Sequence, residues 1–66
     1  MFTYAPLQKI LFERKIKKLE LMELADISTS TLAKLSKDED VKLTTLVKIC
    51  IALDCTLNDI VEIKQP

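Results

Sequence analysis

The sequence contains no glycine, histidine or tryptophan, and its two prolines are Pro6 and Pro66. Because the favoured turns of β-hairpins need Asn-Gly or Asp-Gly pairs, the absence of glycine argues against a sheet with tight hairpins. Helices joined by short polar connections are the expected architecture. The absence of histidine and of a glycine-rich phosphate loop argues against an enzyme.

Cysteine is also scarce, with only Cys50 and Cys55 in the chain. Two thiols without a histidine do not form a zinc site, because four-thiolate sites need two more cysteines. Cys50 falls on the apolar face of an expected helix, where it would fill space in the core. We therefore predict no metal and no other cofactor.

Long apolar runs are missing as well. No stretch reaches the roughly 18 consecutive apolar residues of a membrane span, and the N-terminus lacks the pattern of a signal peptide. The sequence therefore predicts no membrane association and a cytoplasmic location. At 66 residues, of which 48% are hydrophobic, the chain is expected to form one domain over 1–66, with marginal stability that dimerisation would improve.

Charge of either sign is not in excess, since ten basic and ten acidic side chains give a formal net charge of zero. Zero net charge argues against indiscriminate nucleic-acid binding, which depends on neutralising phosphates. The distribution is uneven, however, with a basic cluster at 14–18 and an acidic run at 38–40. A polarised neutral protein can still bind DNA with one face.

The spacing of apolar residues predicts five helices, at about 6–15, 18–25, 28–37 and 43–53 and in a short segment after Thr56. Asp26 falls in the break before the third helix and is expected to adopt a left-handed backbone conformation. Val41 and Leu43 are expected to face inward, as is Val47. A solvated loop is expected at Asp38, Glu39 and Asp40.

The third predicted helix has a distinctive outer face. Ser28 is expected to cap it through its hydroxyl, while Leu32 and Leu35 share the inner face. Small polar groups followed by positive charge then lie outside, at Thr29, Ser30, Ala33, Lys34 and Lys37. Such a helix fits the major groove of DNA, although a simple solvated face has the same pattern.

The last two predicted helices carry more apolar side chains than so small a core needs. We therefore consider a dimer contact formed by Ile51, Ile60, Val61 and Ile63, with plain core packing as the alternative. Val61 and Ile63 are assigned here to the last helix. Phe12 lies off the apolar stripe of the first helix, where it is either a second core contact or part of a partner surface.

Two segments carry a family resemblance: LMELADISTSTLAKL at 21–35 and VKLTTLVKICIALDCTLNDIVE at 41–62. With them the chain resembles the Xre family of helix-turn-helix regulators, similar to the DNA-binding domains of phage repressors and Cro. The resemblance implies an all-α, compact, five-helix, lambda-repressor-like domain of prokaryotic or phage origin. It also implies a sequence-specific transcriptional regulator, expected to be a repressor, that binds double-stranded DNA as a homodimer.

The resemblance implies roles at matching positions. Base-reading positions are Thr29, Ser30, Ala33 and Lys34. Phosphate-contacting positions are Ser28, Lys37, Lys42, Thr44 and Thr45, to which we add Lys18 of the basic cluster.

The sequence departs from the family pattern at Asp26, where glycine is usual, and at Lys42, where a capping serine is common. These two positions, together with the acidic run, are expected to weaken DNA binding. Zero net charge, the acidic run and the surplus of apolar side chains favour an alternative function, a protein-interaction module that keeps the helix-turn-helix fold. Such a module would be an antitoxin or adaptor with a toxin-like protein partner.

Overall fold

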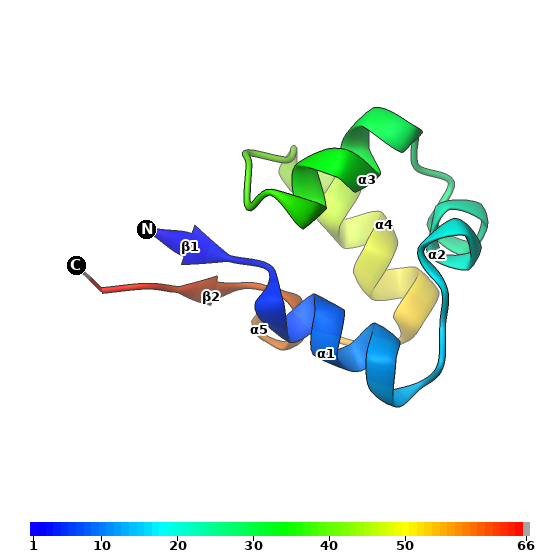
Figure 1. Ribbon diagram of the computed structural model, residues 1–66, viewed down its shortest axis with the longest axis horizontal. Coiled ribbons are helices and arrows are strands. Elements are labelled where there is room, and N and C mark those ends of the chain that lie inside the picture. Colours follow the sequence, from blue (N-terminus) through cyan, green and yellow to red (C-terminus); the bar gives the residue numbers. More distant parts are fainter. Residues whose placement is uncertain (66) are drawn as a thin grey trace.

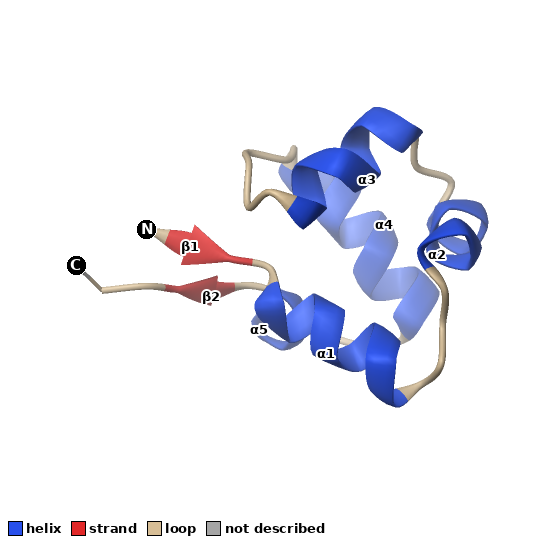
Figure 2. Cartoon of the chain, viewed as in Figure 1, coloured by secondary structure: helices blue, strands red, loops and turns tan. Residues whose placement is uncertain are grey.

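The computed structural model describes residues 1–65, which form five helices and a small two-stranded sheet (Figures 1 and 2). In chain order these are β1 (Phe2–Thr3), α1 (Ala5–Glu13), α2 (Lys18–Ala25), α3 (Thr29–Ser36), α4 (Leu43–Leu53), α5 (Leu57–Ile60) and β2 (Glu62–Ile63). The predicted all-α, five-helix fold is confirmed.

Helix α4 is the centre of the molecule and packs against both α2 and α5. Helix α1 packs on α5, and α3 packs on α2, so that α1 and α3 lie on opposite sides of α4 in Figure 1. One continuous core joins them, formed by Tyr4, Leu7, Leu11, Leu21, Ala25, Leu35, Leu46, Ile49, Cys50, Leu53 and Ile60. The expectation that Cys50 fills core space is confirmed, since its side chain is only 8% exposed.

Three helices differ from their predicted limits: α3 is one residue shorter at each end, and α1 and α5 end earlier than predicted. Helix α1 ends at Glu13 because Lys15 adopts a left-handed conformation with φ of 57°. Helix α5 ends at Ile60, and the assignment of Val61 and Ile63 to it was wrong. Val61 is extended, and the next two residues pair antiparallel with β1, Ile63 opposite Phe2. β-Branched residues favour such extended backbone, and here a strand partner is available.

Among residues 1–65, four adopt the positive φ that favours glycine, which the chain lacks: Lys15, Asp26, Asp38 and Asp54. Each follows one of the helices α1 to α4. In all four turns the next residue donates its N–H to a carbonyl five positions earlier, as Ile27 does to Met22 at 3.1 Å and Cys55 to Cys50 at 2.9 Å. This bond satisfies a carbonyl at the helix end. The left-handed conformation expected of Asp26 is confirmed.

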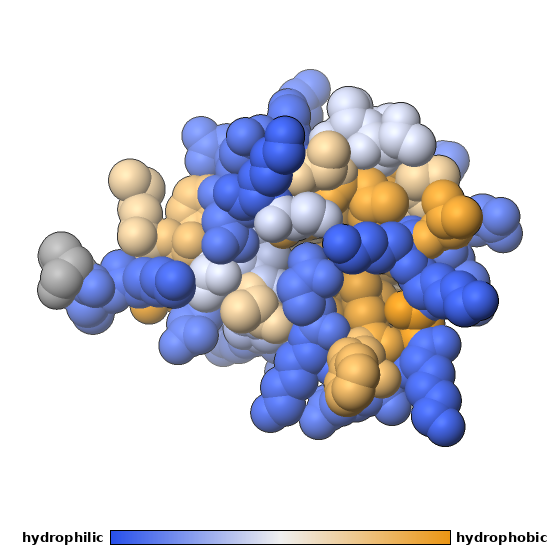
Figure 3. All heavy atoms as spheres, in the orientation of Figure 1, coloured by the Kyte–Doolittle hydropathy of each residue, from blue (hydrophilic) through white to orange (hydrophobic). Residues whose placement is uncertain are grey.

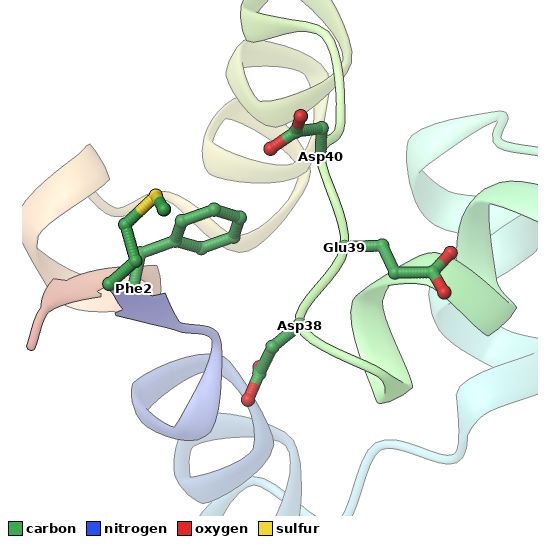
Figure 4. Close-up of a pocket in the computed structure, with 5 residues that line it drawn as sticks. Phe2, Asp38, Glu39 and Asp40 are labelled. Carbon is green, nitrogen blue, oxygen red and sulfur yellow. The ribbon is translucent and has the colours of Figure 1, made fainter.

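The sequence predicted that the acidic run at 38–40 is a solvated loop, but part of it makes hydrogen bonds to the N-terminal segment. The carboxylate of Asp38 accepts hydrogen bonds from the Thr3 hydroxyl at 3.1 Å and the Tyr4 N–H at 2.9 Å. The Tyr4 hydroxyl donates to the Glu39 carbonyl at 2.9 Å. Figure 4 shows the Asp38 side chain directed at the start of α1, while Glu39 points away from it. These bonds hold the N-terminal segment against the loop that follows α3.

Candidate nucleic-acid interface

The first turn of α3 is held by the cap predicted at Ser28. The Ser28 hydroxyl accepts the Thr31 N–H at 3.2 Å, and it lies within hydrogen-bond distance of the Ser30 and Thr31 hydroxyls. Ser28 itself is extended, with φ of −83° and ψ of 165°. The cap leaves other N–H groups of this turn unpaired within the helix, and such groups attract anions.

The outer face of α3 is open to solvent over its full length. Thr29, Ser30, Ala33 and Lys34 are all exposed, while Leu35 on the inner face is 1% exposed and fixes the helix to the core. In the space-filling view, the start of α3 is pale and its far end is blue (Figure 3). The face presents small, nearly neutral groups first, and Lys34 and Lys37 add positive charge afterwards.

Further polar groups lie at the ends of α3 and α4. Lys37 is the exposed C-cap residue of α3, and Lys42 is the exposed N-cap residue of α4, where its side chain makes no capping hydrogen bond. Thr44 is exposed and Thr45 is half-buried in the first turn of α4. Helix α4 begins at Leu43 without a side-chain cap, so the departure at Lys42 does not shorten it.

The two ends of the basic cluster have different partners. The Lys18 ammonium donates to the Ser36 hydroxyl at 3.2 Å, which in turn donates to the Leu32 carbonyl. Lys18 thus joins the first turn of α2 to the last turn of α3, and its charge lies beside the outer face of α3. Arg14 instead donates to the Leu53 carbonyl at the end of α4. Positive charge at the C-terminus of a helix interacts favourably with the helix dipole.

The four residues considered for a dimer contact are not equivalent. Ile51 and Ile63 are 75% and 77% exposed, and Val61 is half-buried. Ile60 is completely buried. Because α5 packs against α1 and α4, Ile60 is a core residue, and a surface contact through it is excluded in this fold.

Sequence reasoning also missed exposed apolar side chains on α4. Leu43 and Val47 were expected to face inward, but they are 61% and 42% exposed. Their spacing with Ile51, four and eight residues apart, was the available signal, since such residues share one helix face. Buried Ile49 and Cys50 show which face of α4 meets the core.

Residues 1–65 contain no group of three His, Cys, Asp or Glu side chains placed to hold a metal ion. Within the same range, no helix is both long and apolar enough to cross a membrane.

Comparison with known proteins agrees with this geometry. Residues 6–66 match the family model described as the Cro/C1-type HTH DNA-binding domain. A solved structure titled transcriptional regulator VanUg, form II, is 48% identical in sequence and superposes with a TM-score of 0.88. The match covers 92% of this chain and 81% of that one. A search of curated proteins found no match. The chain therefore belongs to the Cro/C1-type helix-turn-helix DNA-binding family.

Proposed function

We propose that this protein is a sequence-specific transcriptional regulator that binds double-stranded DNA as a homodimer, with α3 in the major groove. It acts as a repressor by covering the DNA to which other proteins would bind. The observation that carries the proposal is the outer face of α3, where four exposed side chains lie on a capped helix fixed to the core by buried Leu35.

Within this proposal, Lys34 is the main base-reading residue. Lysine donates to the O6 and N7 atoms of guanine, and small side chains contact base edges or the thymine methyl group. Thr29 and Ser30 approach the bases from the first turn, where the Ser28 cap sets the direction of the helix. Ala33, beside Lys34 and also exposed, leaves room for close approach to a methyl group.

The proposed phosphate contacts surround these base-reading positions. Positive charges at Lys18, Lys37 and Lys42 flank α3, and hydroxyls at Ser28, Thr44 and Thr45 lie in or next to the first turns of α3 and α4. Phosphate contacts position a protein on DNA but carry no sequence information directly. Removing a phosphate contact is therefore expected to weaken binding to all DNA alike.

The test is selection of bound duplexes from a random pool, followed by binding titrations with three variants. Lys34→Ala is expected to lose sequence preference. Lys37→Ala is expected to keep the preference, weaken all DNA, and reduce the slope of log K against log salt by about 0.9. Lys9→Ala, at an exposed lysine of α1, is the matched control and should bind like the wild type. Absence of detectable binding to any DNA at about 50 mM salt would refute the proposal.

A second candidate function, the protein-interaction module, rests on Phe12 of α1. Its side chain is 85% exposed, and exposed aromatic residues are enriched in protein interfaces. We propose a toxin-like protein as the partner in that case. Co-purification of a partner with the wild type but not with Phe12→Ser would support this function, and equal recovery with both would count against it.

A further inference from the structure

Helix α4 carries apolar side chains on its solvent side as well as in the core. Leu43, Val47 and Ile51 are 61%, 42% and 75% exposed. Because they are spaced by four residues, they form one row along the helix, about 12 Å long at 1.5 Å per residue. Since this row is separate from the buried residues of α4, the fold itself does not account for it.

Helix α2 extends this row sideways. Leu24, 56% exposed, lines a shallow groove between α2 and α4 together with Ile51. The other residues of the groove are Ala25, Asp26, Lys48 and Ala52. We call the surface formed by Leu24, Leu43, Val47 and Ile51 the α4 stripe. Contiguous apolar surface of this kind typically marks an interaction site.

We infer that the α4 stripe is the face on which a second copy of this chain packs to form the dimer; its use in binding a two-fold DNA site rests on the proposed function. In a two-fold arrangement with the α4 helices antiparallel, Val47 lies near the axis. Leu43 of one copy then lies opposite Ile51 of the other. The row is thus complementary to itself, as an interface between identical surfaces requires.

The charges beside the stripe favour a second copy over a partner of one dominant charge. The groove is bordered by one cation, Lys48, and one anion, Asp26. Two-fold symmetry can bring Lys48 of each copy to Asp26 of the other, giving two opposite-charge pairs. A strongly acidic or strongly basic partner would leave one of these two groups against a like charge.

The location of the stripe also suits the proposed DNA-binding surface. None of its four residues lies on α3, so the outward side chains of α3 stay outside the interface, while Leu43 lies between the proposed phosphate contacts Lys42 and Thr44. The accessible surface of the protein is 4813 Å², and a standard interface covers about 800 Å² per partner. The stripe consists of four side chains on α2 and α4, fewer than the roughly 20–30 residues that each partner contributes to a standard interface. We therefore expect a weak dimer, with a Kd in the micromolar range, that DNA binding strengthens.

The first experiment compares two isoleucines of matched exposure by sedimentation equilibrium from about 5 to 500 μM. Ile51→Glu is expected to raise the dimer Kd at least tenfold. Ile63→Glu, at a residue exposed equally but located in β2, should leave the Kd unchanged. Far-UV circular dichroism checks that both variants are folded. Retained dimerisation of Ile51→Glu, or selective loss in Ile63→Glu, overturns the inference.

The second experiment exchanges the charges. Lys48→Glu and Asp26→Lys are each expected to dimerise more weakly than the wild type, because like charges then meet across the interface. An equimolar mixture of the two variants should form a heterodimer, in which every pair is again of opposite charge. No recovery of association in the mixture contradicts the proposed pairing.

Dimerisation and DNA binding fail in distinguishable ways. A protein that dimerises through Ile51 but binds no DNA refutes the proposed function and supports the interface. A protein that binds DNA but stays monomeric both free and on a palindromic site overturns the interface alone. A third outcome also overturns the assignment to a second copy. In it, the wild type does not self-associate but captures a different protein, and Ile51→Glu no longer captures that protein.

Discussion

Replacing Asp26 with glycine is expected to stabilise the fold, whereas the same replacement at Asp38 is expected to destabilise it. Both residues adopt nearly the same left-handed conformation, with φ of 54° and 56°. The turn at Asp26 is held by backbone groups, because the N–H groups of Asp26 and Ile27 both donate to the Met22 carbonyl. At Asp38 the side chain takes part as well, since its carboxylate accepts from Thr3 and Tyr4.

The expected sizes follow from these contacts. A left-handed conformation costs an L-residue about 1–2 kcal/mol, and replacement by glycine removes this cost. The greater freedom of glycine in the unfolded chain offsets about 0.5–1 kcal/mol of that gain. Asp26→Gly should therefore stabilise by about 0.75 kcal/mol at the middle of these ranges, or about 3–6 °C in Tm. Asp38→Gly gains the same relief but loses two partly exposed hydrogen bonds of about 1–1.5 kcal/mol each. Its net effect should be a destabilisation of about 1–2.5 kcal/mol.

Urea and thermal unfolding followed by circular dichroism measure both effects, at a protein concentration well below the dimer Kd so that self-association does not contribute. Asp38→Asn serves as the control, because asparagine tolerates the left-handed conformation and keeps one acceptor oxygen. Its stability should lie between those of the wild type and Asp38→Gly. If both glycine variants stabilise equally, the Asp38 bonds contribute nothing. If both destabilise, the cost assigned to the left-handed conformation is wrong.

Two further predictions concern pH. Burial, followed by the charge of Asp40, raises the pKa of Tyr4 above 10.0, so its contribution to stability is complete below pH 10 and is lost as the pH rises through the folded pKa. Tyr4 is the sole tyrosine, so absorbance at 295 nm follows its ionisation alone. The titration midpoint should lie above pH 10, and Asp40→Asn should lower it. A midpoint at or below pH 10 would contradict this prediction. The Thr56 backbone N–H and then its hydroxyl lower the pKa of Asp59 below 3.8, so that contribution is present above the unfolded value and lost as the pH falls through the folded pKa. Urea unfolding between pH 5 and 2 should therefore show that Asp59→Asn loses less stability with falling pH than Asp54→Asn does. Equal losses of stability would count against the hydrogen bonds between Asp59 and Thr56.

Local sequence signals were sufficient for most of the helical framework. The limits predicted for α2 and α4 are those observed, and Ser28 caps α3 as expected. The Asp59 carboxylate accepts the Thr56 N–H at 2.9 Å at the start of α5, a hydrogen bond between residues only three positions apart. Each of these features depends on residues within one or two turns, and such interactions are encoded in spacing and residue type. The exposed face of α3 follows from the same local pattern.

Contacts between distant segments decided the rest. Val61 and Ile63 have apolar spacing that suits a helix, but β2 forms because β1, nearly sixty residues earlier in the chain, lies beside it. Asp38 was predicted to be a solvated loop residue, because the sequence does not show that Thr3 lies next to it in the folded chain. Likewise, helical spacing placed Val47 on the core side of α4, and only the packing of α2 and α5 leaves it partly exposed.

The sequence alone therefore determined the number of helices, the limits of α2 and α4, and the small polar face with Lys34 that α3 presents. It did so because helix formation, capping and amphipathic spacing are short-range properties of the chain. Tertiary structure decided that Ile60 is core, that Ile51 belongs to an exposed stripe, and that the N-terminal segment is fastened to Asp38. Burial and hydrogen bonding across the chain depend on which segments meet, and residue spacing within one helix does not specify that.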